Sequence, residues 1–173
     1  MDVTETVNAA ARLLQPFQVG AGSRIQNRLD VVVKPEDLPA ATRALCDARW
    51  GYLSAITGLD LPWPKTPVKP GAATAPAEAS GPLEDRLEAL YQFVSGPVVV
   101  TLRVSVPYHD PRIPSICPAI PSATLYEREL QDMFGFVIDG TPDRGRLLLS
   151  DDWPDGVFPL RKAFTGLDTA TKT

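Results

Sequence analysis

The sequence has little of the equipment from which metal centres are built. Its 173 residues include two cysteines, Cys46 and Cys117, and a single histidine, His109. These three side chains are too few for a tetrahedral Cys/His zinc site or for a four-cysteine iron–sulfur cluster. The two cysteines form no CxxC pair, so we expect reduced thiols, which suits a reducing cytoplasm. We expect His109 to be a surface or interface residue.

Long apolar runs and excess positive charge are also missing. No run approaches the ~18 apolar residues that indicate a transmembrane helix, and the N-terminus lacks the pattern of a signal peptide. Any membrane association is therefore expected to pass through a partner. The net charge of −4 and the pI near 5.0 argue against a nucleic-acid binder. Gly20-Ala21-Gly22 lacks the third glycine of a dinucleotide-binding loop.

The residues that are present predict one small α/β (α+β) domain. With 44% hydrophobic and 22% charged residues, the composition is that of a globular protein with a real core. Apolar spacing predicts a helix over the first dozen residues and a second one that begins at Pro35. Strands are predicted over 29–33, 52–57, 86–95 and 98–106, with the second strand ending at Gly58-Leu59-Asp60 and the last two forming a hairpin at Gly96-Pro97. We therefore expect a mixed β-sheet flanked by helices.

The second half of the chain is less regular. Residues 62–82 are rich in proline and alanine and predict an insertion, and 107–121 predict a stiff, extended connection. A helix follows and ends at Gly135, with a cap at Ser122 or Thr124, a capping box from Thr124 to Glu127, and an apolar stripe of Ala123, Tyr126, Leu130, Met133 and Phe134. Only 146–150 suggest a strand after it. We thus divide the chain into an α/β domain over 1–135 and an extended C-terminal segment over 136–173, expected to depend on something else to hold it.

The helix before Gly135 carries an unusual density of charge, with Glu127, Arg128, Glu129 and Asp132. Glu129 and Asp132 lie three residues apart on one face, and Arg128 can pair with Asp132 at i, i+4. Three interpretations stay open. The charges form a solvated helix face, or the two carboxylates serve acid–base chemistry or hold a divalent metal, or the charges meet a neighbouring protein, where desolvated charges set orientation.

The pattern Glu127-Arg128-Glu129, Asp132 and Gly135 resembles the signature of the 30-kilodalton subunit of complex I, which is the C subunit of NADH-quinone oxidoreductase. The resemblance is strongest over 114–164 and weaker over 55–60. It continues through a series of short motifs: Gly140, Pro142-Asp143, Leu147-Leu148, Asp152-Trp153 and Pro159-Leu160-Arg161-Lys162. The same type of subunit occurs in membrane-bound group 4 nickel–iron hydrogenases. The chain departs from respiratory members at Thr141, where they carry histidine, and at Gly145, where they carry arginine, so both branches stay open.

The resemblance implies a small α/β domain with a mixed sheet and an extended tail that wraps a large partner subunit. It implies a scaffold in the hydrophilic arm with no catalytic centre and no cofactor of its own, peripheral on the cytoplasmic side of the cell membrane. Iron–sulfur clusters, and nickel–iron in a hydrogenase, would belong to the large quinone-site or nickel–iron subunit and to a small iron–sulfur subunit. The residues expected at the partner interface are Tyr126, Glu127, Arg128, Glu129, Asp132, Arg146, Trp153, Arg161 and Lys162.

Overall fold

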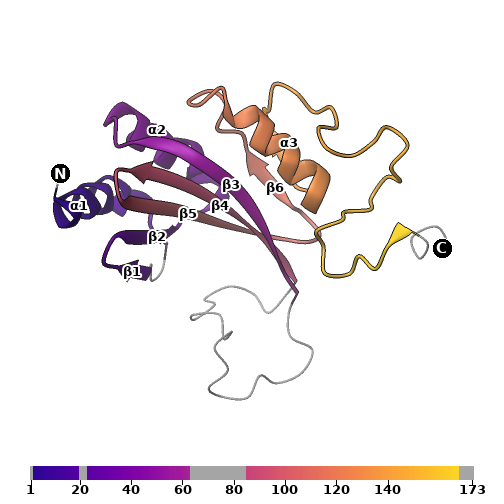
Figure 1. The fold of residues 1–173 in the computed structure, drawn as a ribbon, viewed down its shortest axis with the longest axis horizontal. Helices are drawn as coiled ribbons and strands as arrows, with labels where there is room; N and C mark the ends of the chain where they lie inside the picture. The colour runs from indigo at the N-terminus through magenta and orange to yellow at the C-terminus, as the bar shows by residue number, and fades with distance from the viewer. Residues whose placement is uncertain (1, 20–22, 63–84, 168–173) are drawn as a thin grey trace, which may run out of the picture.

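The computed structural model describes residues 2–19, 23–62 and 85–167. The proline- and alanine-rich insertion expected at 62–82 lies, apart from Pro62, outside these described residues. Within them, no helix is both long enough and apolar enough to cross a membrane. The described residues form a mixed α+β fold, as the sequence predicted, with one main sheet, helices and a long irregular C-terminal segment (Figure 1).

Five strands make up the main sheet, in the order β1-β2-β5-β4-β3. Their bounds are β1 Ser23–Ile25, β2 Arg28–Val32, β3 Tyr52–Leu61, β4 Arg86–Ser95 and β5 Val98–Pro107. Strands β2 and β5 run parallel and the other neighbours antiparallel, so the sheet is mixed. The predicted hairpin is confirmed, with β4 and β5 paired from Ser95↔Val98 onward. Strand β1 is not predicted by the sequence, because its three residues are too few to show a period.

Strand β3 runs further than the sequence suggested. The prediction places this strand over 52–57 and its end at Gly58-Leu59-Asp60. In the structure β3 continues through Gly58 to Leu61 and pairs with β4 over most of its length. Gly58 is needed for packing: a Cβ there would lie 2.4 Å from the ring of Phe134. The glycine lets the later helix approach the strand closely, and it does not end the strand.

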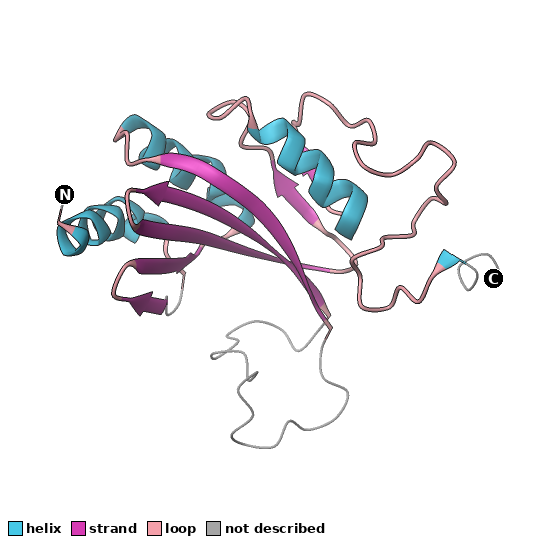
Figure 2. Ribbon diagram, in the orientation of Figure 1, coloured by secondary structure: helices cyan, strands magenta, loops and turns pink. Residues whose placement is uncertain are grey.

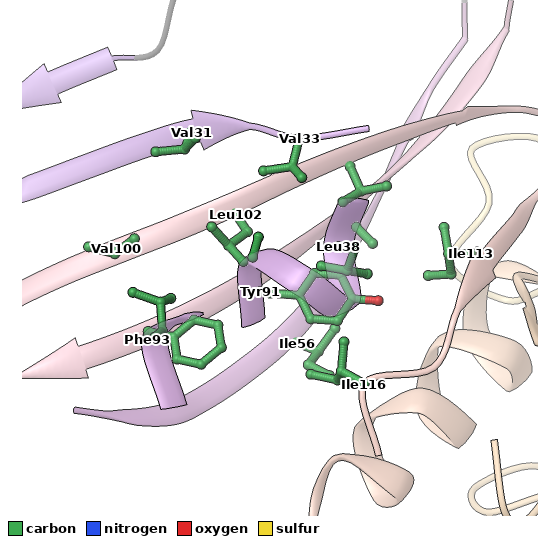
Figure 3. Packing of buried hydrophobic residues seen from close by; sticks show 14 of the residues in the cluster. Val31, Val33, Leu38, Ile56, Tyr91, Phe93, Val100, Leu102, Ile113 and Ile116 are labelled. Atoms are coloured by element: carbon green, nitrogen blue, oxygen red, sulfur yellow. The ribbon is translucent and has the colours of Figure 1, made fainter. Parts of the chain in front are cut away.

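Helices cover one face of the sheet (Figure 2). Helix α1 spans Val3–Leu14 and is followed by the short helix η1, Gln15–Phe17; helix α2 spans Leu38–Asp47 and is preceded by η2, Pro35–Asp37. Both predicted helices are thus confirmed. Their apolar sides bury Val7, Leu14, Leu38 and Leu45 in the core. Figure 3 shows the fully buried Tyr91 ring packed among Leu38, Ile56 and Ile116.

The predicted extended connection contains a short strand that proline content did not reveal. Strand β6, Arg112–Pro114, pairs in parallel with β7, Val137–Asp139, which follows helix α3, Ala123–Phe134. Gly135 ends α3 with φ 74°, the left-handed conformation that glycine adopts most easily. The predicted apolar stripe is confirmed: Ala123, Leu130 and Phe134 are buried, and Tyr126 and Met133 pack against the core.

Two local predictions in this region are wrong. Ser122 caps α3 without a side-chain hydrogen bond, and Glu127 bonds to another segment, so no capping box forms with Thr124. Residues 146–150 form no strand, and 147–149 are bends, because the amides of these three residues bond to a side chain of α3. Both errors arise from tertiary contacts that local pattern cannot show.

Candidate functional site: the charged helix and the C-terminal segment

Helix α3 divides its charges among three directions. Its period of 3.6 residues turns Glu127 toward the core, Arg128 and Asp132 toward the C-terminal segment, and Glu129 toward solvent. The first part of the C-terminal segment lies beside the helix (Figure 1). The charged motif, which consists of Glu127, Arg128, Glu129 and Asp132, therefore mainly holds parts of its own chain together. The side chains that point in each direction have different partners.

Glu127 is fully buried, with 0% of its surface exposed. Its carboxylate accepts hydrogen bonds from the Ser115 hydroxyl at 2.9 and 3.0 Å, from the Ile116 amide at 2.8 Å and from the Cys117 thiol at 3.2 Å. Glu127 thus ties α3 to the segment that follows β6. The resemblance placed Glu127 at a partner contact, whereas the structure places its carboxylate inside its own domain.

The same buried cluster raises two pKa values. Burial raises the pKa of the Cys117 thiol, and its hydrogen bond to the Glu127 carboxylate acts in the same direction. Burial also raises the pKa of Tyr91, with the charge of Glu127 adding to the shift. The Tyr91 hydroxyl is buried and has no hydrogen-bond partner among the described residues. Both groups are therefore held in their neutral, protonated forms.

Arg128 and Asp132 hold the first part of the C-terminal segment. Arg128 donates to the carbonyls of Gly145 and Arg146 at 2.8 and 2.7 Å and pairs with Asp143 at 3.0 Å. A single oxygen of Asp132 accepts the amides of three consecutive residues, at 2.8, 2.8 and 3.3 Å: Leu147, Leu148 and Leu149. The expected i, i+4 pair is thus replaced, since Arg128 and Asp132 both bind the chain that follows.

A second attachment lies at the far end of the segment. Asp60, at the end of β3, accepts the Lys162 amide at 2.6 Å and the Tyr108 hydroxyl. Arg161 donates to the Phe134 carbonyl at 2.6 Å, and its guanidinium lies 4.5 Å from the Tyr108 ring. Burial lowers the pKa of Arg161, and the Asp60 carboxylate opposes that shift. Asp60 is not among the residues that the sequence predicts for the interface; its signal in the sequence is an acid at the end of an apolar strand.

The other predicted interface residues bond within the chain as well. Tyr126 donates to the Ser54 carbonyl of β3 at 3.2 Å. Arg146 bonds to the carbonyls of Ser150 and Asp151 and to the carboxylate of Asp155. The Trp153 indole donates to the Val157 carbonyl at 2.8 Å, and its ring lies 6.1 Å from that of Phe164. Contact of these residues with a partner stays a prediction, and so does docking of residues 136–173.

The described residues offer little for the acid–base interpretation of the motif. They contain no group of three or more His, Cys, Asp or Glu side chains placed to hold a metal ion. Asp132 is 7% exposed and bonded to backbone amides, so it is not turned toward a substrate. Two surface hollows lie against α1, lined in part by Arg12 and Trp50, and no residue of the charged motif lines them.

Replacing Asp132 with asparagine tests how the segment is held. Asparagine lacks the negative charge that strengthens the three amide bonds, so the amides of residues 147–149 should exchange with solvent about tenfold faster or more. Hydrogen–deuterium exchange measures this directly. Glu129→Gln is the matched control, since Glu129 is exposed on the same helix. Equal exchange in both variants would show that Asp132 does not hold the segment.

Comparison with known proteins supplies the wider context. The model of the family described as "Respiratory-chain NADH dehydrogenase, 30 Kd subunit" matches residues 31–170. The C subunit of NADH-quinone oxidoreductase from Roseiflexus castenholzii is 30% identical over 162 residues, which cover 91% of this chain and 81% of that one. Formate hydrogenlyase subunit 5 of Escherichia coli K12 is 49% identical over 63 residues. That match covers 36% of this chain but only 11% of the relative.

A solved structure shares the fold. A chain in the structure of the membrane-bound sulfane sulfur reductase, an archaeal respiratory membrane complex, superposes with a TM-score of 0.69. The alignment covers 97% of this chain and 90% of that one, at 21% sequence identity. The similarity thus extends over the sheet, the helices and most of the C-terminal segment.

Proposed function

This chain belongs to the family of the 30 kDa subunit of the respiratory-chain NADH dehydrogenase, and we propose that it is a hydrophilic-arm subunit of a complex I-like, membrane-bound oxidoreductase. In this role it holds the large catalytic subunit in position, while electrons pass to quinone through iron–sulfur clusters in partner chains. It reaches the cytoplasmic side of the membrane only through those partners.

The arrangement of the C-terminal segment carries this proposal. Past β7 the described segment contains no further strand, yet side chains of α3 and β3 fix its backbone at both ends. Within the described part of this segment, three large apolar side chains are exposed: Leu148, Leu160 and Leu167. Such a surface suits docking to a larger neighbour, and it offers no enclosed site for a substrate.

The relative from Escherichia coli gives independent support for a large neighbour. In formate hydrogenlyase subunit 5, the matching segment makes up 11% of one much longer chain. Regions joined in one polypeptide are held at high effective concentration. A segment that forms a small part of a much longer chain in that relative is well suited to lie against a large neighbouring region.

The proposal that the chain carries no redox cofactor rests on its ligands. The whole sequence has two cysteines and one histidine, and a [2Fe–2S] or [4Fe–4S] cluster held by cysteines needs four thiolates. Cys117 in addition is buried beside Glu127, and the pKa of its thiol is raised, so the thiolate form that binds metals is disfavoured.

The second candidate is the equivalent subunit of a group 4 nickel–iron hydrogenase, in which protons are the electron acceptor. The 49% identity to formate hydrogenlyase subunit 5 favours it, whereas a relative that aligns over 91% of this chain is a C subunit of NADH-quinone oxidoreductase. Both candidates assign the same structural role to this chain and differ only in the chemistry of the large partner.

Affinity purification tests the proposal. A tag on this chain, with solubilisation of the native membranes in mild detergent, should recover a large catalytic subunit and a small iron–sulfur subunit, identified by mass spectrometry. Iron and acid-labile sulfide should accompany them, and nickel in stoichiometric amount would decide for the hydrogenase. Recovery of the chain with no redox subunit, or turnover by the purified chain alone, would contradict the proposal.

A further inference from the structure

One charged side chain of α3 has no task within the described part of the chain. Glu127, Arg128 and Asp132 are all occupied by hydrogen bonds or an ion pair. Glu129 is exposed, and its side chain makes no hydrogen bond or ion pair with any other described residue. The position lies between the side of α3 that holds the C-terminal segment and the side that reaches β3 through Tyr126.

Three exposed leucines lie on α3 or attach to its last turn. Leu125 lies one helical turn before Glu129 and is 54% exposed. Leu148 is 58% exposed and attaches through its amide to Asp132, and Leu160 is 52% exposed and attaches through its amide to the Met133 carbonyl. Asp132 and Met133 belong to the turn that follows Glu129. A carboxylate without a partner among the described residues thus shares α3 with one exposed leucine, and two more exposed leucines attach to the turn that follows it.

This combination restricts what can cover the surface. A partner that buries the leucines also removes water from Glu129, and a desolvated carboxylate without a counter-charge is strongly unfavourable. A purely apolar or an acidic partner surface is therefore excluded by the cost of that one charge. Arginine fits best, because its planar guanidinium pairs with a carboxylate through two hydrogen bonds and its stem packs on apolar side chains.

We propose that Leu125, Glu129, Leu148 and Leu160 form the docking surface for an apolar segment of the large partner subunit that carries an arginine, which pairs with Glu129. This inference rests on the proposed function and deepens it, since it names the one charge of the motif that is available to a partner. Asp132 then contributes indirectly, by holding Leu148 in place, whereas Leu160 is held by the Met133 carbonyl.

Charge reversal tests the pairing in the native complex. Glu129→Arg in the tagged full-length chain should reduce recovery of the large subunit at least tenfold. The control is Glu5→Arg, which makes the same charge change at an exposed acid of α1, at the opposite end of the molecule (Figure 1). Both variants should stay folded, because neither acid is buried. A small drop in the thermal midpoint is expected for Glu5→Arg, since Glu5 lies in the first turn of α1, where a carboxylate is favourable.

The possible outcomes distinguish a failure of the proposed function from a failure of the docking surface. If the wild-type chain recovers no redox subunit, the proposed function fails. If the wild-type chain recovers them and Glu129→Arg recovers them as well as Glu5→Arg does, the proposed function stands and the docking surface is wrong.

A photo-crosslinking amino acid at Leu125 gives an independent readout. It should join this chain to the large subunit, at a peptide containing arginine, whereas the same amino acid at Ile25, which is 65% exposed on β1, should not. A crosslink from position 125 to a second copy of this chain, or none to the large subunit, would overturn the inference.

Discussion

Replacing Glu127 with alanine should lower the free energy of unfolding by about 3 kcal/mol or more, the largest effect expected from any charged residue of the motif. The substitution removes the acceptor of the Ile116 amide and the Ser115 hydroxyl and leaves a void in a fully buried position. A buried donor without an acceptor loses its hydration without compensation, and the neighbouring side chains cannot fill the space. Urea unfolding of the purified chain, followed by circular dichroism, measures the change.

Two further variants make the result specific to the buried cluster. Glu127→Gln keeps one carbonyl oxygen for the Ile116 amide and should cost clearly less than alanine does. Glu129→Ala removes an exposed carboxylate two residues away and should change stability by less than about 0.5 kcal/mol. Similar losses for Glu127→Ala and Glu129→Ala would show that the buried hydrogen bonds do not stabilise the domain.

Replacing Gly135 with alanine should cost about 2 to 3 kcal/mol, for two separable reasons. The residue has φ 74°, which a side chain tolerates poorly, and an added Cβ would lie 2.3 Å from the ring of Phe158. That ring lies 5.5 Å from the Arg161 guanidinium, so its displacement disturbs the attachment of the C-terminal segment. Urea unfolding gives the loss of stability, and faster hydrogen exchange of the Leu160 and Arg161 amides should accompany it.

Gly156 provides the matched control for this experiment. Its φ is also 74°, but nothing lies within 4 Å of the position that a Cβ would take. Gly156→Ala should therefore show only the conformational cost, about 1 kcal/mol. The difference between the two variants isolates the contribution of Phe158 packing. If the two variants lose the same stability, the ring of Phe158 does not hold the segment against α3.

Both experiments test how α3 holds other segments of its own chain in place. The motif residues Glu127, Arg128 and Asp132 act within the chain, and they determine the shape that the chain presents to a partner. Loss of assembly after substitution of Asp132 would therefore have a different cause from loss after substitution of Glu129, because the first releases the backbone of 147–149 and the second removes an exposed charge. Hydrogen exchange in the free chain distinguishes these causes before any complex is isolated.

Local pattern was sufficient for the elements whose residues alternate between core and solvent. The alternation through β5, from Val98 to Val106, and the apolar stripe of α3 predicted both elements and their buried sides. Periods of 2 and 3.6 residues depend only on near neighbours in the chain, so they can be read without knowledge of the fold. The left-handed glycine that ends α3 belongs to the same class of information.

Contacts between distant residues were decided only when the chain had folded. The parallel pair β6 and β7 has three residues in each strand and is separated by a whole helix, so neither strand shows a period of its own. Asp60 bonds to the amide of Lys162, 102 residues later, and nothing near Asp60 in the sequence indicates that partner. The charged motif can be recognised in the sequence alone. The burial of Glu127 and the exposure of Glu129, however, depend on which neighbours pack against each side of α3. A list of charges at helical spacing cannot contain that information, because the direction of each side chain acquires a meaning only when the sheet and the C-terminal segment are in place.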